Sequence, residues 1–137
     1  MSEQTGIIVD RSLWLTYLGE GYLAAGQAMR SKDVAEKALM LARSRGERGH
    51  EASALRLLGV IQTREGPVAS DTARSTLQQA LALSRELGLR PLQVRCHHAL
   101  GMVLALDDPA AAAHHTNLAK LLAAEMALAR PESPSPT

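Results

Sequence analysis

The sequence has few aromatic residues and little cysteine. Among its 137 residues there is no phenylalanine, and one tryptophan and two tyrosines make up 2% of the chain. Cys96 is the only cysteine, so the chain cannot form an internal disulfide, and it has no thiol pair that would indicate a redox motif. This cysteine usage is typical of a reducing compartment, and we expect a cytoplasmic location.

Long apolar runs and charge of one sign are also missing. No apolar run approaches the roughly 18 residues of a membrane-spanning helix, and we expect no membrane partner. The first ten residues, MSEQTGIIVD, lack the basic start and apolar core of a signal peptide. Lys and Arg total 15 against 14 for Asp and Glu, with no basic stripe, so we expect no nucleic-acid partner either.

What is present is a sequence of strong helix formers. Ala and Leu dominate, and β-branched residues are few, so the composition predicts an all-α protein without strands. Gly, Pro, Ser and Asp divide the chain into six helical segments by their usual places at helix ends. The predicted helices run from Asp10 to about Ala25, from a cap at Ser31 to Gly46, from Arg48 to about Glu65, from Ser70 to Gly88, from about Pro91 onward, and from Asp108-Pro109 to about Ala129.

The length is that of a single domain of roughly 100 to 200 residues. We expect a flexible segment over residues 1–9 and a helical domain over residues 10–129. Residues 130–137, RPESPSPT, are rich in Pro and Ser and are expected to form a disordered tail.

The helices form an internal repeat, because the odd-numbered segments match one another and so do the even-numbered ones. In the odd segments Leu15, Leu18, Gly19 and Tyr22 align with Leu55, Leu58, Gly59 and Gln62, and with His97, Leu100, Gly101 and Leu104. In the even segments Ala35, Ala38, Leu39, Leu41 and Ala42 align with Leu77, Ala80, Leu81, Leu83 and Ser84. The last even segment fits best with Thr116, Ala119, Leu122 and Ala123, with an ambiguity of one residue.

The repeated pattern resembles the tetratricopeptide signature. Its glycines, Gly19, Gly59 and Gly101, are 40 and 42 residues apart, which is in the range of repeats built from helical pairs. The resemblance implies an α-solenoid of three antiparallel helix pairs, over residues of about 10–46, 47–88 and 89–129. In such a repeat the glycine lets the two helices of a pair approach closely.

Three segments show a closer resemblance. SLWLTYLGEGYLAAGQ, GERGHEASALRLLGVI and ELGLRPLQVRCHHALGMV are similar to the C-terminal tetratricopeptide region of large bacterial signalling regulators that contain adenylate-cyclase-like or ATPase parts. The similarity extends over about residues 12 to 126 and implies a regulatory or protein-interaction role. The phosphate-binding pattern G-x-x-x-x-G-K-[ST] is not present in this sequence.

One group of residues has the chemistry of a metal site: Cys96, His97 and His98 with His114 and His115. Adjacent helix residues point about 100° apart, so at most one residue of each group can aim at a shared point. His97 occupies a core position of the repeat, and Cys96 is expected to be a small buried thiol without a base to activate it. We therefore expect no metal, no cofactor and no enzymatic activity.

The concave side of a solenoid is lined by the first helix of each pair and is the expected binding surface. We predict a non-catalytic adaptor that binds a protein or peptide partner there or at its ends, and the alternative is a receptor that senses a peptide or small molecule. The residues at the usual inward-facing positions are Thr16, Glu20, Arg56, Val60, Thr63, His98, Met102 and Ala105.

The two ends of the repeat array predict a homodimer, because apolar side chains there have no neighbouring repeat to cover them. Pairing of like ends would bury one such patch symmetrically and close the assembly. The alternative is that residues 1–9 fold back over the first helix. The end residues are Leu13, Trp14 and Tyr17 in the first helix and Leu118, Leu121, Leu122 and Met126 in the last.

Overall fold

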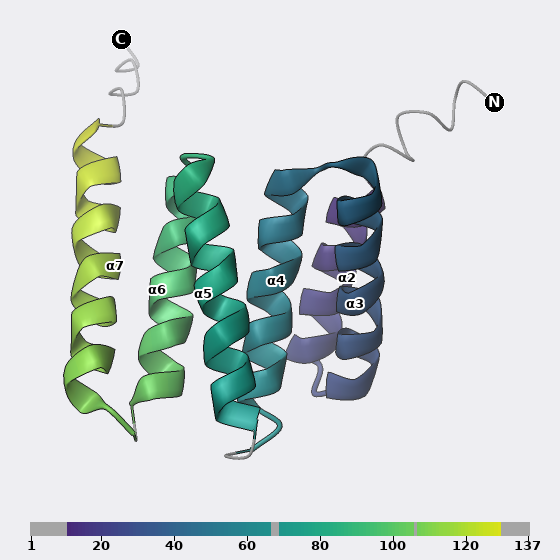
Figure 1. The fold of residues 1–137 in the computed structure, drawn as a ribbon, viewed down its shortest axis with the longest axis horizontal. Coiled ribbons are helices and arrows are strands. Elements are labelled where there is room, and N and C mark those ends of the chain that lie inside the picture. Colours follow the sequence, from purple (N-terminus) through teal and green to yellow (C-terminus); the bar gives the residue numbers. More distant parts are fainter. Residues whose placement is uncertain (1–10, 67–68, 106, 130–137) are drawn as a thin grey trace, which may run out of the picture.

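The computed structural model describes residues 11–66, 69–105 and 107–129. These ranges form six α-helices and no strand, which confirms the all-α fold with six helical segments (Figure 1). The helices are α2 (Arg11–Ala24), α3 (Ala28–Arg45), α4 (Arg48–Thr63), α5 (Ser70–Glu86), α6 (Arg90–Leu104) and α7 (Pro109–Ala129).

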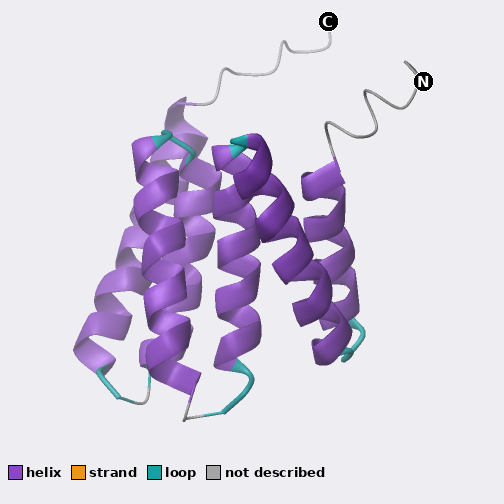
Figure 2. Cartoon of the chain, turned by 45° about the vertical axis from the view of Figure 1, so that its right-hand side comes forward, coloured by secondary structure: helices purple, strands orange, loops and turns teal. Residues whose placement is uncertain are grey.

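The helices pack as three pairs that stack side by side. The pairs are α2 with α3, α4 with α5, and α6 with α7 (Figures 1 and 2). The second helix of a pair also packs on the first helix of the next pair, as α3 does on α4 and α5 on α6, and the first helices α2, α4 and α6 contact one another in order. Among the described helices α7 packs on α6 alone.

Most helix ends lie where the sequence predicts them. Gly46 and Gly88 follow α3 and α5 with φ of 68° and 69°, a left-handed conformation that glycine adopts without a Cβ clash. Asp108 caps α7, since its Oδ1 accepts a hydrogen bond of 3.1 Å from the backbone N–H of Ala111.

The predicted start of the second helix at Ser31 is wrong. Helix α3 begins at Ala28, and Ser31 lies inside it and is buried. The Ser31 hydroxyl donates a hydrogen bond of 2.6 Å to the carbonyl oxygen of Gly19, so it joins α3 to α2 instead of capping α3.

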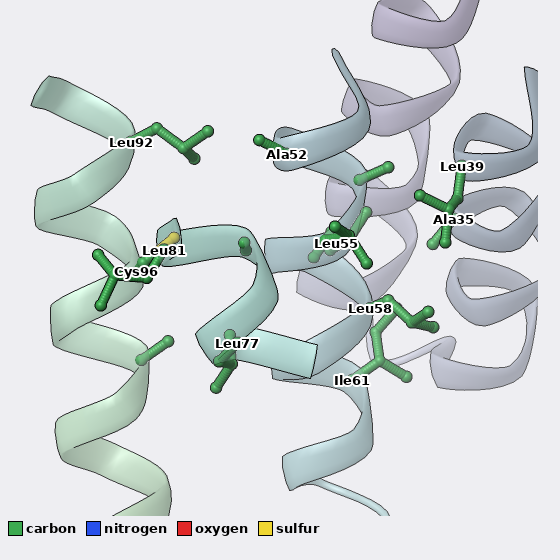
Figure 3. Close-up of a cluster of buried hydrophobic side chains, with 14 of the residues drawn as sticks. Ala35, Leu39, Ala52, Leu55, Leu58, Ile61, Leu77, Leu81, Leu92 and Cys96 are labelled. Atoms are coloured by element: carbon green, nitrogen blue, oxygen red, sulfur yellow. The ribbon is translucent and has the colours of Figure 1, made fainter. Parts of the chain in front are cut away.

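The hydrophobic core is continuous from α2 to α6, and α4 lies at its centre. Leu55, Leu58 and Ile61 of α4 lie between Leu39 of α3 on one side and Leu77 of α5 on the other (Figure 3). Burial of such aliphatic side chains contributes about 1.5–3 kcal/mol each. The core therefore depends on contacts between successive helices, as a repeat array requires.

The repeated glycines lie at close approaches between helices. A Cβ atom added at Gly59 would meet Leu77 of α5, and one added at Gly101 would lie 2.8 Å from Thr116 Oγ1 of α7. At Gly19 it would lie 2.7 Å from Leu57 Cδ2 of α4. These contacts confirm that helices approach closely at the aligned glycines.

Several expectations fall outside the described residues. They are the flexible segment over residues 1–9, the helix start at Asp10, the fold-back of residues 1–9 and the disordered tail over residues 130–137.

None of the described helices has both the length and the apolar character that crossing a membrane requires.

Candidate functional site

A pocket of about 590 Å³ opens between α4, α6 and α7. Its lining combines small or flexible apolar side chains with cationic side chains from all three helices. The apolar residues are Val60, Val94, Ala99, Met102, Ala119 and Ala123, the cationic ones are Arg56, Arg64, Arg95 and Lys120, and Thr63, His98 and Thr116 complete the lining.

Helical spacing brings these residues to one surface. On α6, Arg95, His98 and Met102 are separated by three and four residues and therefore share a face. On α7, Thr116 and Lys120 are related in the same way. The pocket thus collects one stripe of side chains from each helix.

The pocket is open because no described helix follows α6 and α7 in the stack. The aligned residues Thr16, Arg56 and His98 show the effect. The Thr16 residue is 1% exposed and the Arg56 side chain 11%, while His98 is exposed. The first two positions belong to α2 and α4, which pack on the next first helix, and α6 has no such neighbour in the described part of the chain.

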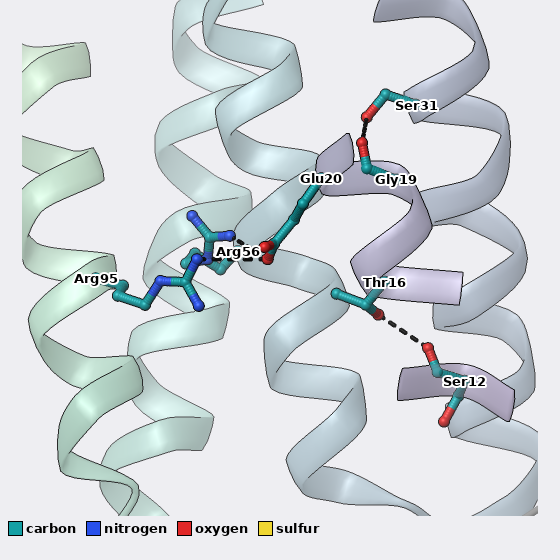
Figure 4. A network of polar contacts seen from close by, with 7 residues as sticks. All are labelled: Ser12, Thr16, Gly19, Glu20, Ser31, Arg56 and Arg95. Atoms are coloured by element: carbon teal, nitrogen blue, oxygen red, sulfur yellow. Dashed lines mark hydrogen bonds and ion pairs between the residues drawn. The ribbon is translucent and has the colours of Figure 1, made fainter. Parts of the chain in front are cut away.

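The prediction that Thr16 lines the groove is therefore wrong. Thr16 lies one turn before Glu20 on the side of α2 that faces α4, and its hydroxyl donates a hydrogen bond of 3.0 Å to the carbonyl oxygen of Ser12 (Figure 4). A side chain buried in this way cannot contact a partner.

Glu20 joins the three first helices through one carboxylate. Its Oε2 accepts hydrogen bonds from Arg56 Nη2 at 2.8 Å and from Arg95 Nη2 at 3.4 Å (Figure 4). Burial lowers the pKa of the Arg56 guanidinium, and the nearby positive charge of Arg95 acts in the same direction, while Glu20 opposes both. Arg56 is thus held by an internal partner and is largely buried, although it also lines the pocket.

The structure brings five of the eight predicted groove residues together. Arg56, Val60, Thr63, His98 and Met102 all line the pocket. Glu20 lies beside it as the partner of Arg56, and Ala105 is exposed after the end of α6 without lining it.

Sequence analysis missed the other cationic residues and the contribution of α7. Arg64 lies four residues after Val60, and Arg95 three residues before His98. Extending each predicted stripe by one helical turn would have found both. The pocket residues of α7 could not be found in this way. Only the first helix of each pair was expected to line the groove, and α7 is a second helix.

His97 and Cys96 lie in the core behind the pocket, as the repeat pattern predicts. His97 is 1% exposed, and its Nδ1 lies 2.9 Å from His115 Nδ1 of α7. Burial, together with the charge of His115, lowers the pKa of His97 to about 4. Burial also raises the pKa of the Cys96 thiol to about 11, so it stays protonated at neutral pH.

No metal cluster accompanies these residues in the described ranges. Residues 11–66, 69–105 and 107–129 include no group of three or more His, Cys, Asp or Glu side chains that could hold a metal ion. The pair formed by His97 and His115 is held by packing between α6 and α7.

The N-terminal end of the stack exposes two aromatic side chains. Trp14 is 60% exposed and Tyr17 59%. The residues aligned with Trp14 in the later repeats, Ala54 and Cys96, are fully buried because a preceding repeat covers them. Of the other predicted end residues, Leu121 is exposed. The remaining ones are partly buried, namely Leu13, Leu118, Leu122 and Met126.

Comparison with known proteins adds no assignment to the pocket. Neither the known protein families nor the curated protein sequences include a match to this chain. Its function has to follow from the geometry of the pocket and the chemistry of the lining.

Proposed function

We propose that the chain is a non-catalytic interaction module of the tetratricopeptide type that binds a protein or peptide in the pocket between α4, α6 and α7. The observation that supports this proposal is the combination of apolar and cationic side chains that line a hollow of about 590 Å³. Protein interfaces likewise combine apolar and polar side chains.

The lining favours a macromolecular partner over a small ligand. The volume also fits a small-molecule site, which is usually about 300–1,000 Å³, so the alternative is a sensing receptor. Met102 in the lining is 63% exposed, and an exposed, adaptable methionine is typical of surfaces that accept a protein segment.

The setting that we propose is regulatory. The resemblance to the C-terminal repeat regions of bacterial signalling regulators supports such a role, and the free thiol of Cys96 suits a reducing cytoplasm. In this setting the module would couple a partner protein to a signalling response.

The proposal is tested by capture from an extract of the source organism with the immobilised protein. Met102→Glu places a negative charge in the lining of the pocket. Met40→Glu is the matched control, because Met40 is 72% exposed on α3 and does not line the pocket. A partner identified by mass spectrometry should be retained by the control and lost with Met102→Glu. Retention by both variants would place the binding site elsewhere and contradict the proposal.

The proposal includes self-association through the end of α2. Exposed aromatic side chains that lie together normally mark a contact, and Trp14 and Tyr17 are one helical turn apart. Contact between like ends closes a twofold dimer and leaves the pocket of each copy free. Light scattering should show a dimer that Trp14→Glu dissociates and Met40→Glu does not. A monomer at high micromolar concentration would rule the dimer out.

A further inference from the structure

The pocket adjoins the place where the first helix of a further repeat would pack on α6 and α7. Helix α3 packs between α2 and α4, and α5 packs between α4 and α6, whereas α7 has α6 alone in the described part of the chain. From this pattern we infer that the pocket binds an acidic amphipathic α-helix of a protein partner, which packs where the first helix of a further repeat would pack. The inference rests on the proposed function and names the kind of partner.

The repeat alignment shows which residues of α7 face this place. Lys120 and Ala123 correspond to Leu81 and Ser84 of α5. Both α5 residues are buried in the array, where α5 packs on α6. Lys120 and Ala123 are exposed and line the pocket. A helix placed on them would therefore reproduce the contact between α5 and α6.

The apolar part of the surface fits one face of a helix. Met102 of α6 and Val60 of α4 both line the pocket. An incoming helix with apolar side chains at every third or fourth position would cover both. Its ridge of side chains would pack between α6 and α7 as helices of the array already do.

The charge of the pocket lining indicates which polar side chains the partner helix carries. Arg64, Arg95 and Lys120 also line the pocket, and none of the described residues that line it is acidic. Arg95 makes only a bond of 3.4 Å to Glu20, so its guanidinium is available to a second carboxylate. Positive side chains beside apolar ones attract a helix with acidic side chains beside its apolar stripe.

A second copy of this chain fits the surface poorly. The available first helix would be α2, whose outward residues include Arg11, Trp14 and Tyr17. Trp14 takes the place of the small residues Ala54 and Cys96, which pack against the preceding pair within the array. Arg11 would also bring positive charge to a positive surface. The first helix of a second copy is therefore not the occupant that we propose.

The inference is tested with four synthetic peptides of about 18 residues, roughly five helical turns. The first has a leucine stripe with helical spacing flanked by Glu, and the second has Lys in place of Glu. The third has the composition of the first in an order without a stripe, and the fourth carries a central Pro, which breaks a helix. Fluorescence anisotropy should show that the first peptide binds at least about tenfold more tightly than each of the others.

Charge reversal in the protein locates the bound peptide. Arg64→Glu combined with Lys120→Glu should weaken binding of the acidic peptide roughly tenfold and improve binding of the basic one. The matched control combines Lys37→Glu with Arg90→Glu, which changes the net charge equally at exposed positions outside the pocket. The control should bind like the unchanged protein at physiological salt, because the effect of distant charges is screened.

The other outcomes overturn the inference in distinct ways. Equal affinity for the acidic and basic peptides would exclude an acidic partner, and full binding of the proline peptide would exclude a helical one. Self-association that Met102→Glu abolishes would make a second copy the occupant. If no peptide binds but Met102→Glu still removes a captured partner, the inference fails while the proposed function stands.

Discussion

Gly59 lies where α4 and α5 come closest, and a Cβ atom at this position would lie 2.5 Å from Leu77 Cγ. Leu77 is fully buried, and its backbone nitrogen would also lie 3.4 Å from the added Cβ. We therefore expect Gly59→Ala to lower the free energy of unfolding by about 1–3 kcal/mol, as other overpacked core substitutions do. Urea denaturation followed by circular dichroism measures the change.

Gly21 provides the matched control for this substitution. It lies within α2, and a Cβ atom there would meet nothing within 4 Å. Gly21→Ala should stabilise the protein by about 0.5–1 kcal/mol, because alanine loses less backbone entropy in a helix than glycine does. A change of the same sign in both variants would mean that packing at Gly59 is not decisive.

The burial of His97 makes stability depend on pH. Its pKa is about 4 in the folded protein, against 6.5 for the exposed side chain. Between these values the unfolded chain binds more protons, so the free energy of unfolding should fall as the pH is lowered from about 7 towards 4, by up to about 3 kcal/mol. Urea denaturation at a series of pH values measures this dependence.

His97→Leu should reduce the acid sensitivity, because leucine occupies the aligned positions 15 and 55. Some sensitivity should remain, since burial also lowers the pKa of His115. His98→Gln removes an exposed imidazole from the same helix and should leave the acid sensitivity in place. An unchanged pH profile in His97→Leu would show that His97 is not its source.

At the residue scale, the sequence predicts which side chains are buried better than it predicts which side chains they contact. The alignment with Leu15 and Leu55 identifies His97 as a core residue because periodicity reports burial. It cannot predict that His97 meets His115, since the rotation of α7 against α6 depends on the whole contact between them. The paired state of Arg56 was missed for the same reason.

At the element scale, α7 is the helix with the fewest neighbours. It packs on α6 alone, and Ala112 and Ala119 are its only buried residues in the described range. In a repeat array the stability of each unit depends on its neighbours. We therefore expect the amides of α7 to exchange with solvent deuterium well before those of α4, which packs against four other helices. Exchange followed by mass spectrometry tests this, and equal protection of α7 and α4 would contradict it.

The existence and order of the helices could be predicted because glycine and proline mark their ends. The start of α3 could not, since its N-cap residue Gln27 makes no side-chain cap, whereas the more typical cap residue Ser31 bonds to Gly19 of α2. A serine hydroxyl can serve either purpose, and the local sequence does not distinguish them.

At the scale of the whole molecule, the sequence predicted five of the thirteen residues that line the pocket. The residues on α4 and α6 follow from the repeat, because first helices line the concave side. The contribution of α7 and the burial of Thr16 depend on which helix has a following neighbour. That is a property of the stack and of its ends, which no single repeat contains.

Glu20 has a consequence for the lifetime of the folded state. Its bond to Arg95 joins residues 75 positions apart and connects α2 with α6, whereas the packing contacts of the array join helices at most two apart in the chain. A contact that closes so long a loop forms late in folding, so its loss should act on unfolding. We expect Glu20→Gln, which leaves Arg56 without its charged partner, to speed unfolding roughly tenfold with little change in the folding rate.

Stopped-flow measurements in urea separate the two rates. Glu86→Gln, which removes an exposed ion pair with Arg48, should change neither rate appreciably. If Glu20→Gln instead slows folding, the carboxylate engages before the array is complete. If it speeds unfolding, the Glu20 side chain couples the unfolding of the three repeats. An array of separate units then unfolds as slowly and as cooperatively as a single domain.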